Sequence, residues 1–310
     1  MSQISAITLK QLRALIAVAE QGSLTGAAGV LNQTTPAIHS QIRKLEEAVG
    51  QALLVRGGAA DGFSLTAAGV AMERVARRIE GNLSQVGAEI AAMTRGYNGH
   101  VRLSVVSTGK YFAPRLVLAL RQQAPEVEVS LRVGNRQQVI ADLDQGATDL
   151  AVMGRPPSEP KVVSVPLGAH PHGIILPPGH RLAATDGFDP AMLMEETFLA
   201  RESGSGTRDL MMRYFDRLGE GIEPQLITMD SNETIKQAVM AGMGIALLSL
   251  HTCSEELQMG RLVALRGSGL PLMRQWYLVR PAAAKPDAAT LRVAQAIEDL
   301  AGSYFPHLAG

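Results

Sequence analysis

The stretch Leu31–Gly50, LNQTTPAIHSQIRKLEEAVG, predicts a short helix with two unlike faces. Thr35 is expected as its N-cap, Pro36 falls in the first turn, where its missing N–H costs nothing, and Gly50 ends the helix. One face is an apolar stripe with spacings of four, three and four, which we expect to be buried: Ile38, Ile42, Leu45 and Val49. The opposite face is short, polar and basic: Thr35, Pro36, His39, Ser40 and Arg43.

Two more helices are predicted before this one. The first has an apolar face that ends at Gly22: Leu9, Leu12, Ile16 and Ala19. Ser23 is expected to cap the second, whose inner side is small or apolar: Ala27, Ala28 and Leu31. A turn near residues 32–34 joins it to the third helix. The major groove of DNA is about 12 Å wide and admits one helix with small side chains at its N-terminal end. The pair therefore predicts a helix-turn-helix, with Gln33 and Thr34 at the margins of the groove.

A two-stranded wing is predicted after Gly50. Residues 53–55 are apolar, Arg56 follows, and a loose run at 57–62 separates them from Phe63 and Leu65. Arg56 is placed to reach a backbone phosphate or the minor groove. The alternative for the whole segment is an ordinary three-helix bundle whose outer face is only solvated.

Three stretches resemble the winged helix-turn-helix domain of LysR-type transcriptional regulators. They are TLKQLRALIAVAEQGSLTGAA (residues 8–28), LNQTTPAIHSQIRKLEEAVG (residues 31–50) and SLTAAG (residues 64–69). The resemblance extends over essentially the whole chain. It implies double-stranded promoter DNA as a partner. RNA polymerase is a further candidate partner.

A second apolar period begins at Thr66. Its spacing averages 3.5 residues, which is typical of a coiled-coil seam: Met72, Val75, Ile79, Leu83, Val86, Ile90 and Met93. A lone helix would leave this stripe in water, so a second copy of the chain is expected to cover it. The alternative is that the helix packs on its own C-terminal domain. The LysR resemblance implies a linker-helix homodimer that assembles into a homotetramer.

The predicted fold class is an α+β multidomain protein. We expect a winged helix-turn-helix domain over residues 1–65, a linker helix over 66–95 and an effector-binding domain over 96–310, because the pattern changes at Gly96–Gly99. Beyond it, strands and helices alternate as βαβαβ, which predicts a parallel sheet. These elements are strands 101–106, 127–133 and 150–153 and helices 113–121 and 137–143. A second set of strands is expected near 173–176, 197–200, 226–228, 245–248 and 276–279.

Two such lobes form a cleft like that of periplasmic binding proteins, a fold that the family shares. Lobe I is expected at about 100–166 and 268–310, and lobe II at about 167–267. In open α/β sheets a ligand sits beyond the carboxyl ends of the strands, where helix N-termini offer free amides. Hydroxyls, glycines and cations follow the predicted strand ends and indicate a small anionic effector: Ser107, Thr108, Lys110, Tyr111, Asn135, Arg136, Gly154, Arg155, Glu202, Gly204, Ser205, Gly206, Thr207, Arg208 and Asn232.

The run SGSGTR, residues 203–208, suits an anion nest, with Thr207 expected to cap the next helix. It lacks the GxxxxGK[ST] spacing of a nucleotide-hydrolysing loop. Together with STGKYFAPRL (107–116), VGNRQQVIADLDQGATDLAVMGRPP (133–157) and HPHGIILPPGHRLA (170–183), it resembles the CbbR-type regulators of Calvin-cycle (CO2 fixation) operons. That resemblance implies activation in response to a phosphorylated sugar or acid, or NADPH. A LysR-type regulator of another operon, sensing a different small anion, is the alternative.

Composition adds few positive signals. The 29 basic and 29 acidic residues cancel, although residues 1–95 hold nine basic against seven acidic side chains. The single cysteine, Cys253, cannot form an internal disulfide, and the N-terminal stretch does not resemble a signal peptide, so a cytoplasmic protein is expected. No apolar run reaches the about 18–20 residues that a membrane helix needs, so no membrane partner is predicted.

Neither a metal site nor catalysis is predicted. His170, His172 and His180 lie among prolines that suggest a loop and strand entry, without a Cys or carboxylate to complete a ligand set. Ser249 and Cys253 lie near His251, but no GxSxG elbow is present, so the protein is expected not to be an enzyme. The competing classes are a solute-binding receptor and an enzyme with a periplasmic-binding-type fold.

Overall fold

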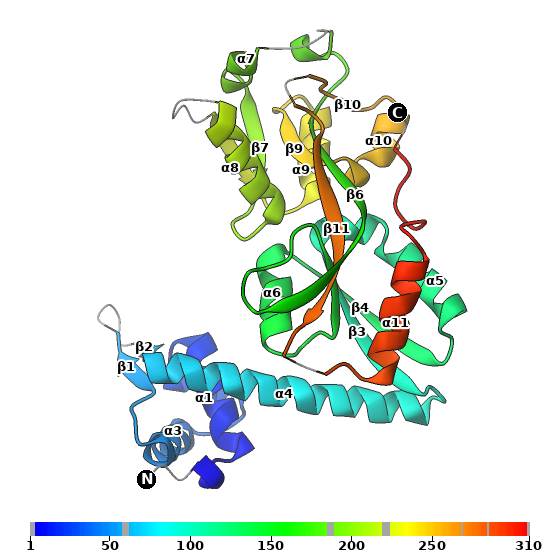
Figure 1. The fold of residues 1–310 in the computed structure, drawn as a ribbon. Coiled ribbons are helices and arrows are strands. Elements are labelled where there is room, and N and C mark those ends of the chain that lie inside the picture. The colour runs from blue at the N-terminus through cyan, green and yellow to red at the C-terminus, as the bar shows by residue number, and fades with distance from the viewer. Residues whose placement is uncertain are drawn as a thin grey trace. The chain divides into compact units, whose positions relative to one another are not determined.

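The structure is a computed structural model of the chain. It describes residues 4–57, 62–184, 189–218, 224–267, 269–283 and 285–308. The chain divides into two compact units: Met1–Gly87 with Asp144–Ala147, and Ala88–Leu143 with Thr148–Gly310. Figure 1 shows the helices and strands of both, labelled where there is room.

The first unit opens with a short 3-10 turn, η1 (Ile4–Ala6), and the helices α1 (Leu9–Gln21), α2 (Leu24–Val30) and α3 (Thr35–Val49). The predicted ends at Gly22, Ser23 and Gly50 are confirmed. Ser23 Oγ accepts a hydrogen bond from Gly26 N at 3.0 Å. Gly22 and Gly50 adopt the left-handed conformation that ends a helix. The N-cap of α3 is Thr34 and not Thr35. Both have a hydroxyl, but Thr34 has the extended backbone of a cap, and its Oγ1 accepts from Ala37 N at 3.3 Å.

These helices share one core. Leu15, Val18, Ile38 and Leu45 are fully buried in it. The predicted stripe of α3 shifts at its end, where Ala48 is buried and Val49 only half-buried. Shortly after α3, the strands β1 (Leu54–Arg56) and β2 (Phe63–Leu65) pair antiparallel as the predicted wing. Residues 58–61 of its loose run lie outside the described residues.

Helix α4 (Ala67–Thr94) continues from the wing for 28 residues. Met72 and Ile79 pack against the core of the three helices. The other five side chains of the predicted seam are exposed: Val75, Leu83, Val86, Ile90 and Met93.

Lobe I of the second unit contains the predicted βαβαβ pattern. Strands β3 (Gly99–Val106), β4 (Val127–Gly134) and β5 (Leu150–Met153) are parallel in the order β4-β3-β5. The lobe's other elements are η2 (Ser107–Tyr111) and the helices α5 (Ala113–Gln123), α6 (Arg136–Asp144) and α11 (Ala288–Asp299). Fully buried side chains of β3, α5 and α11 form one core with Trp276.

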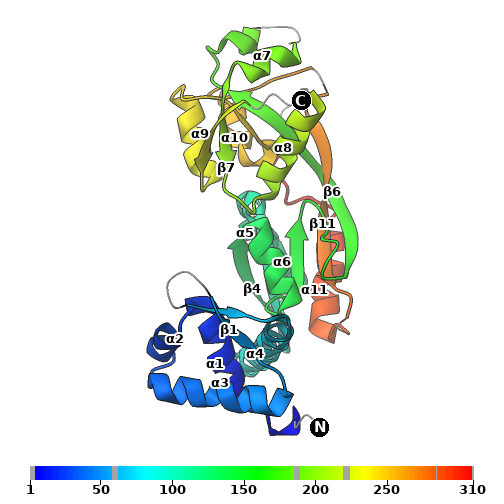
Figure 2. The ribbon, with the colours of Figure 1, turned by 90° about the vertical axis from the view of Figure 1, so that its left-hand side faces the viewer.

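Lobe II is built around strands β7 (Thr197–Arg201) and β8 (Gln225–Met229), which are parallel. Helices α8 (Gly206–Leu218) and α9 (Asn232–Met240) lie on either side of β7, as Figure 2 shows. Side chains of β7 alternate between them, since Phe198 packs in the cluster that contains α8 and Leu199 in the one that contains α9. The lobe also contains η3 (Arg181–Ala184), α7 (Pro190–Met194), β9 (Ala246–Ser249), η4 (Leu250–Thr252), α10 (Ser254–Gln258) and β10 (Val263–Ala264).

Two long antiparallel strands, β6 (Val162–Leu176) and β11 (Leu272–Pro281), run through both lobes (Figure 1). They join all the strands of the second unit except β7 and β8 into one seven-stranded sheet of order β10-β6-β11-β5-β3-β4, with β9 paired to β6. The predicted parallel sheet of β3, β4 and β5 is therefore confirmed, whereas β6, β9, β10 and β11 pair antiparallel. Residues 162–172 were missed as strand because Pro166, Gly168 and Pro171 interrupt the expected alternation, and residues 272–275 and 280–281 extend the predicted strand at both ends. The predicted return to lobe I at residue 268 lies outside the described residues.

Candidate functional site

The polar face predicted on α3 is open to solvent. Gln33, Thr34, Pro36, His39, Ser40 and Arg43 are exposed, and Thr35 is half-buried. Arg43 Nε donates to Glu47 Oε1 at 2.9 Å, but both side chains are well exposed. Such a pair contributes only about 0–1 kcal/mol, so DNA phosphate or a base edge can displace the glutamate.

The wing carries the second cationic group of this surface. Arg56 is exposed, and its guanidinium lies 5.9 Å from the ring centre of Phe63 on the paired strand. Glu46 Oε1 accepts from Leu53 N at 2.8 Å, which ties the residues before the wing to the end of α3. The fold therefore fixes the wing against the helix that carries the polar face.

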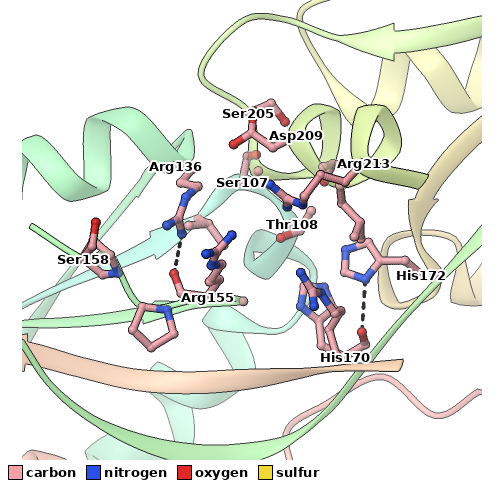
Figure 3. Close-up of a pocket in the computed structure, with 18 residues that line it drawn as sticks. Ser107, Thr108, Arg136, Arg155, Ser158, His170, His172, Ser205, Asp209 and Arg213 are labelled. Carbon is pink, nitrogen blue, oxygen red and sulfur yellow. Dashed lines mark hydrogen bonds between the residues drawn. The ribbon is translucent and has the colours of Figure 1, made fainter. Parts of the chain in front are cut away.

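The second unit contains a cavity of about 410 Å³ between its lobes (Figure 3). Of the predicted effector contacts, the following line it: Ser107, Thr108, Arg136, Gly154, Arg155, Ser205, Gly206 and Thr207. Helix α8 begins at Gly206, so Thr207 lies in its first turn and is not its cap. The cavity thus faces the N-terminal end of α8, where free amides and the helix dipole favour an anion.

Four arginines line this cavity, and two of them were not predicted. Arg213 lies on α8 and Arg274 on β11, beside the predicted Arg136 and Arg155. None of the four forms an ion pair with a described carboxylate, and the one acidic residue in the lining is Asp209, whose charge acts to raise the pKa of Arg136. Burial, and then the positive charge of Arg155, lowers the pKa of Arg136. Burial and the charges of Arg213, Arg155 and Arg217 lower the pKa of Arg274. The cluster is therefore a site of unbalanced positive charge that an anion would neutralise.

The helical period could have identified Arg213. It lies seven residues after Gly206, so both residues face the same side of α8 as Asp209 and Leu210. Arg274 gave no such signal, since its part of β11 was not predicted as a strand.

Several predicted contacts lie outside the cavity lining and form hydrogen bonds within the protein instead, either between the lobes or within lobe II. Lys110 Nζ and Tyr111 Oη donate to the carboxylate of Glu233 at 2.5 and 2.6 Å. Glu202 accepts from Arg201 at 2.7 and 2.8 Å, and Asn232 accepts from Arg201 at 2.6 Å. Whether such a residue lines the cavity depends on the direction of its side chain, and its position after a strand does not reveal that direction.

The remaining predicted contacts support the backbone around the cavity. Asn135 Oδ1 accepts from Gln138 N at 3.0 Å and so caps α6. Gly204 has a φ of 82°, and its carbonyl accepts from Gln137 N at 3.2 Å. Arg208 donates to the carbonyl of Arg201 at 2.9 Å.

His170 and His172 also line the cavity, which sequence reasoning missed. Both lie inside β6 and are buried, so the predicted loop is wrong here. His180 lies elsewhere and contacts Glu196 at 3.3 Å. Among the described residues, no group of three or more His, Cys, Asp or Glu is arranged to hold a metal ion. Cys253 is buried, and burial raises the pKa of its thiol to about 12.

Two family models match this chain. A bacterial regulatory helix-turn-helix model of the lysR family matches residues 9–70, and the LysR substrate binding domain matches residues 94–302. The chain therefore belongs to the LysR family of DNA-binding transcriptional regulators and is not an enzyme. No helix in the described part of the chain is long and apolar enough to cross a membrane.

Within this family the chain is of the CbbR type. The HTH-type transcriptional regulator CbbR of Cereibacter sphaeroides is 55% identical over 306 residues, which are 99% of each chain. The RuBisCO operon transcriptional regulator of Allochromatium vinosum is 39% identical over 88% of this chain and 89% of its own. The solved regulatory domain of CcmR from Synechocystis PCC6803, in complex with 2-PG, is 33% identical with a TM-score of 0.62. That match covers 66% of this chain and 98% of the CcmR chain.

Proposed function

We propose that this regulator binds the promoter of a CO2-fixation operon as an activator and that its cavity holds a phosphorylated effector. The target genes follow from the names of its relatives, which are CbbR-type and RuBisCO operon regulators. The DNA contacts follow from the exposed polar face of α3 and from Arg56 on the wing.

The four cavity arginines carry the effector proposal. Arginine offers a planar set of donors that matches phosphate and carboxylate, and it stays charged when buried. Arg136, Arg155, Arg213 and Arg274 converge without carboxylate partners, and the amide end of α8 faces the same space. A volume of about 410 Å³ suits a small metabolite. An adjoining open groove shares Arg155, Arg213 and Arg274, so a longer phosphorylated ligand such as NADPH could extend into it.

Self-association completes the proposed function. The exposed apolar residues of α4 supply a surface for a second copy, and pairs of dimers would form the tetramer. Effector binding between the lobes would change the spacing of the DNA-binding domains and so the bend of the promoter. Footprints of the same length and bend with and without saturating effector would contradict this step.

A thermal-shift panel tests the effector class. The probes are 3-phosphoglycerate, a sugar bisphosphate and NADPH, each measured on the wild type, Arg274→Gln and the matched control Arg261→Gln. Arg261 is exposed and lies outside the cavity. We expect at least one probe to raise the Tm of the wild type and the control, and Arg274→Gln to lose most of that rise. A response to unphosphorylated anions alone would favour the regulator of another operon, and a gel shift on the DNA upstream of its own gene tests promoter binding.

A further inference from the structure

The ring of His172 presents a hydrogen-bond acceptor to the arginine-lined cavity. Its Nδ1 lies 3.1 Å from the carbonyl oxygen of His170 (Figure 3). A carbonyl can only accept, so Nδ1 carries the proton. Burial lowers the pKa of His172 to about 3, so the ring is neutral at physiological pH. The other ring nitrogen, Nε2, therefore has a free lone pair.

No described residue donates a hydrogen bond to this nitrogen. His172 is 5% exposed and lines the cavity, and Nε2 is at the tip of its ring. An acceptor that faces the cavity without a protein donor can take a hydrogen bond from a ligand group. Besides the Asp209 carboxylate, the cavity therefore offers His172 Nε2 as an acceptor among its cationic donors.

The neighbouring rings hold this acceptor in place. The ring of His170 lies 4.1 Å from that of His172 and stacks on Trp276 at 3.7 Å. His170 Nε2 contacts Ser249 Oγ at 3.0 Å, while its Nδ1 is buried against Gly154. His172 thus has a fixed ring orientation, and it is the histidine whose free nitrogen a ligand can reach.

An ionised phosphate or carboxylate cannot donate a hydrogen bond to His172 Nε2, because its oxygens are acceptors only and their lone pairs would repel that of the nitrogen. Those groups pair with the arginines. A hydroxyl group can donate to Nε2. Resting on the phosphorylated effector proposed above, we propose that His172 selects phosphorylated effectors that carry a hydroxyl group, such as a sugar phosphate or a phosphorylated hydroxy acid.

Two probes isolate this hydroxyl. 3-Phosphoglycerate and phosphoglycolate both carry a phosphate and a carboxylate, and they differ by one CH(OH) unit. Calorimetric titration of the full chain gives a dissociation constant for each. We expect the wild type to prefer 3-phosphoglycerate by about tenfold, the value of one ordinary hydrogen bond.

Two substitutions at the same position assign the preference to Nε2. His172→Phe keeps a flat ring but removes the acceptor, so the preference should fall to about twofold or less while phosphoglycolate binding is kept. His172→Gln retains an acceptor oxygen and should restore most of the preference. This variant also tests the proposal if His172→Phe does not fold. Circular dichroism and the Tm establish folding.

The outcomes separate the two proposals. Equal affinity of the wild type for both probes, or an unchanged preference in folded His172→Phe, overturns the role of His172 and leaves the phosphate proposal standing. If neither these probes nor the other phosphorylated ligands bind, the proposed effector class falls, and the role of His172 falls with it.

Discussion

Arg201 Nη1 donates a hydrogen bond to Asn232 Oδ1 at 2.6 Å, and the two residues are 3% and 1% exposed. The same nitrogen donates to Ser107 Oγ in lobe I at 3.2 Å, and Glu202 accepts from the other side of the guanidinium. The buried cation is therefore paired, and it links β7 to the start of α9 and to lobe I. Asn232 and Glu202 were predicted to contact the ligand, but they instead hold Arg201, which bonds to lobe I.

Substitutions at Asn232 test this link. Asn232→Ala should lower the free energy of unfolding by about 1–3 kcal/mol, because Arg201 loses a buried acceptor. Asn232→Asp should match the wild type or exceed it, since the Asn232 Nδ2 group has no partner and an acid suits the first turn of a helix. Urea unfolding provides both values, and equal losses in the two variants would contradict the assignment.

Arg43 provides a test of the DNA face. Arg43→Ala should weaken binding to the operator by about 1–3 kcal/mol if the guanidinium bonds a guanine bidentately. Glu47→Gln, which frees Arg43 from its exposed ion pair, should not weaken binding. Gel shifts on operator and random DNA at one fixed salt concentration measure both. A loss of equal size on the two DNAs would assign Arg43 to a phosphate.

The seam of α4 contains two kinds of position. Ile90→Asp should dissociate dimers while leaving the Tm of the separated chain nearly unchanged, because Ile90 is 60% exposed. Ile79→Asp should instead lower the stability of the DNA-binding unit by about 2–4 kcal/mol, because Ile79 packs on its core. Sedimentation velocity and thermal unfolding distinguish the two effects. An unchanged mass for Ile90→Asp would rule out the seam as a self-association surface.

Acid should destabilise the second unit through its buried histidines. Burial lowers the pKa of His172 to about 3 and that of His251 to about 4, and it also lowers the pKa of His170. Below about pH 6.5 these histidines therefore bind protons in the unfolded chain but not in the folded chain, so stability falls as the pH falls. His172 contributes about 1.4 kcal/mol per pH unit between about pH 6 and 4, and His170 and His251 add to the slope in the same direction. Urea unfolding at several pH values should show a shallower slope for His172→Phe, and identical slopes would contradict a buried neutral His172.

The DNA-binding unit was largely predictable because its structure is local. Caps, glycines and a helical period determine α1, α2 and α3 within a few residues of each boundary. The one displaced N-cap, Thr34 for Thr35, depended on backbone angles that two adjacent threonines leave undecided.

The cavity was predictable only where it is made of strand ends. Ser107, Gly154 and Ser205 follow parallel strands, and such positions meet at one edge of a sheet. His172 and Arg274 come instead from the interiors of β6 and β11, whose pairing joins residues about a hundred positions apart. Their convergence depends on long-range register, which one sequence does not reveal.

The two strands that cross between the lobes also determine how this sensor can move. Their register is continuous from Leu272 to Pro281 except for one irregularity between Trp276 and Tyr277, opposite the segment from Pro166 to Gly168. A loop hinge rotates freely, whereas paired strands resist a change of angle along their whole length. In the function proposed above, closure on an effector would flex a continuous β-ribbon at that irregularity, and a stiffer ribbon would require tighter effector binding for the same response.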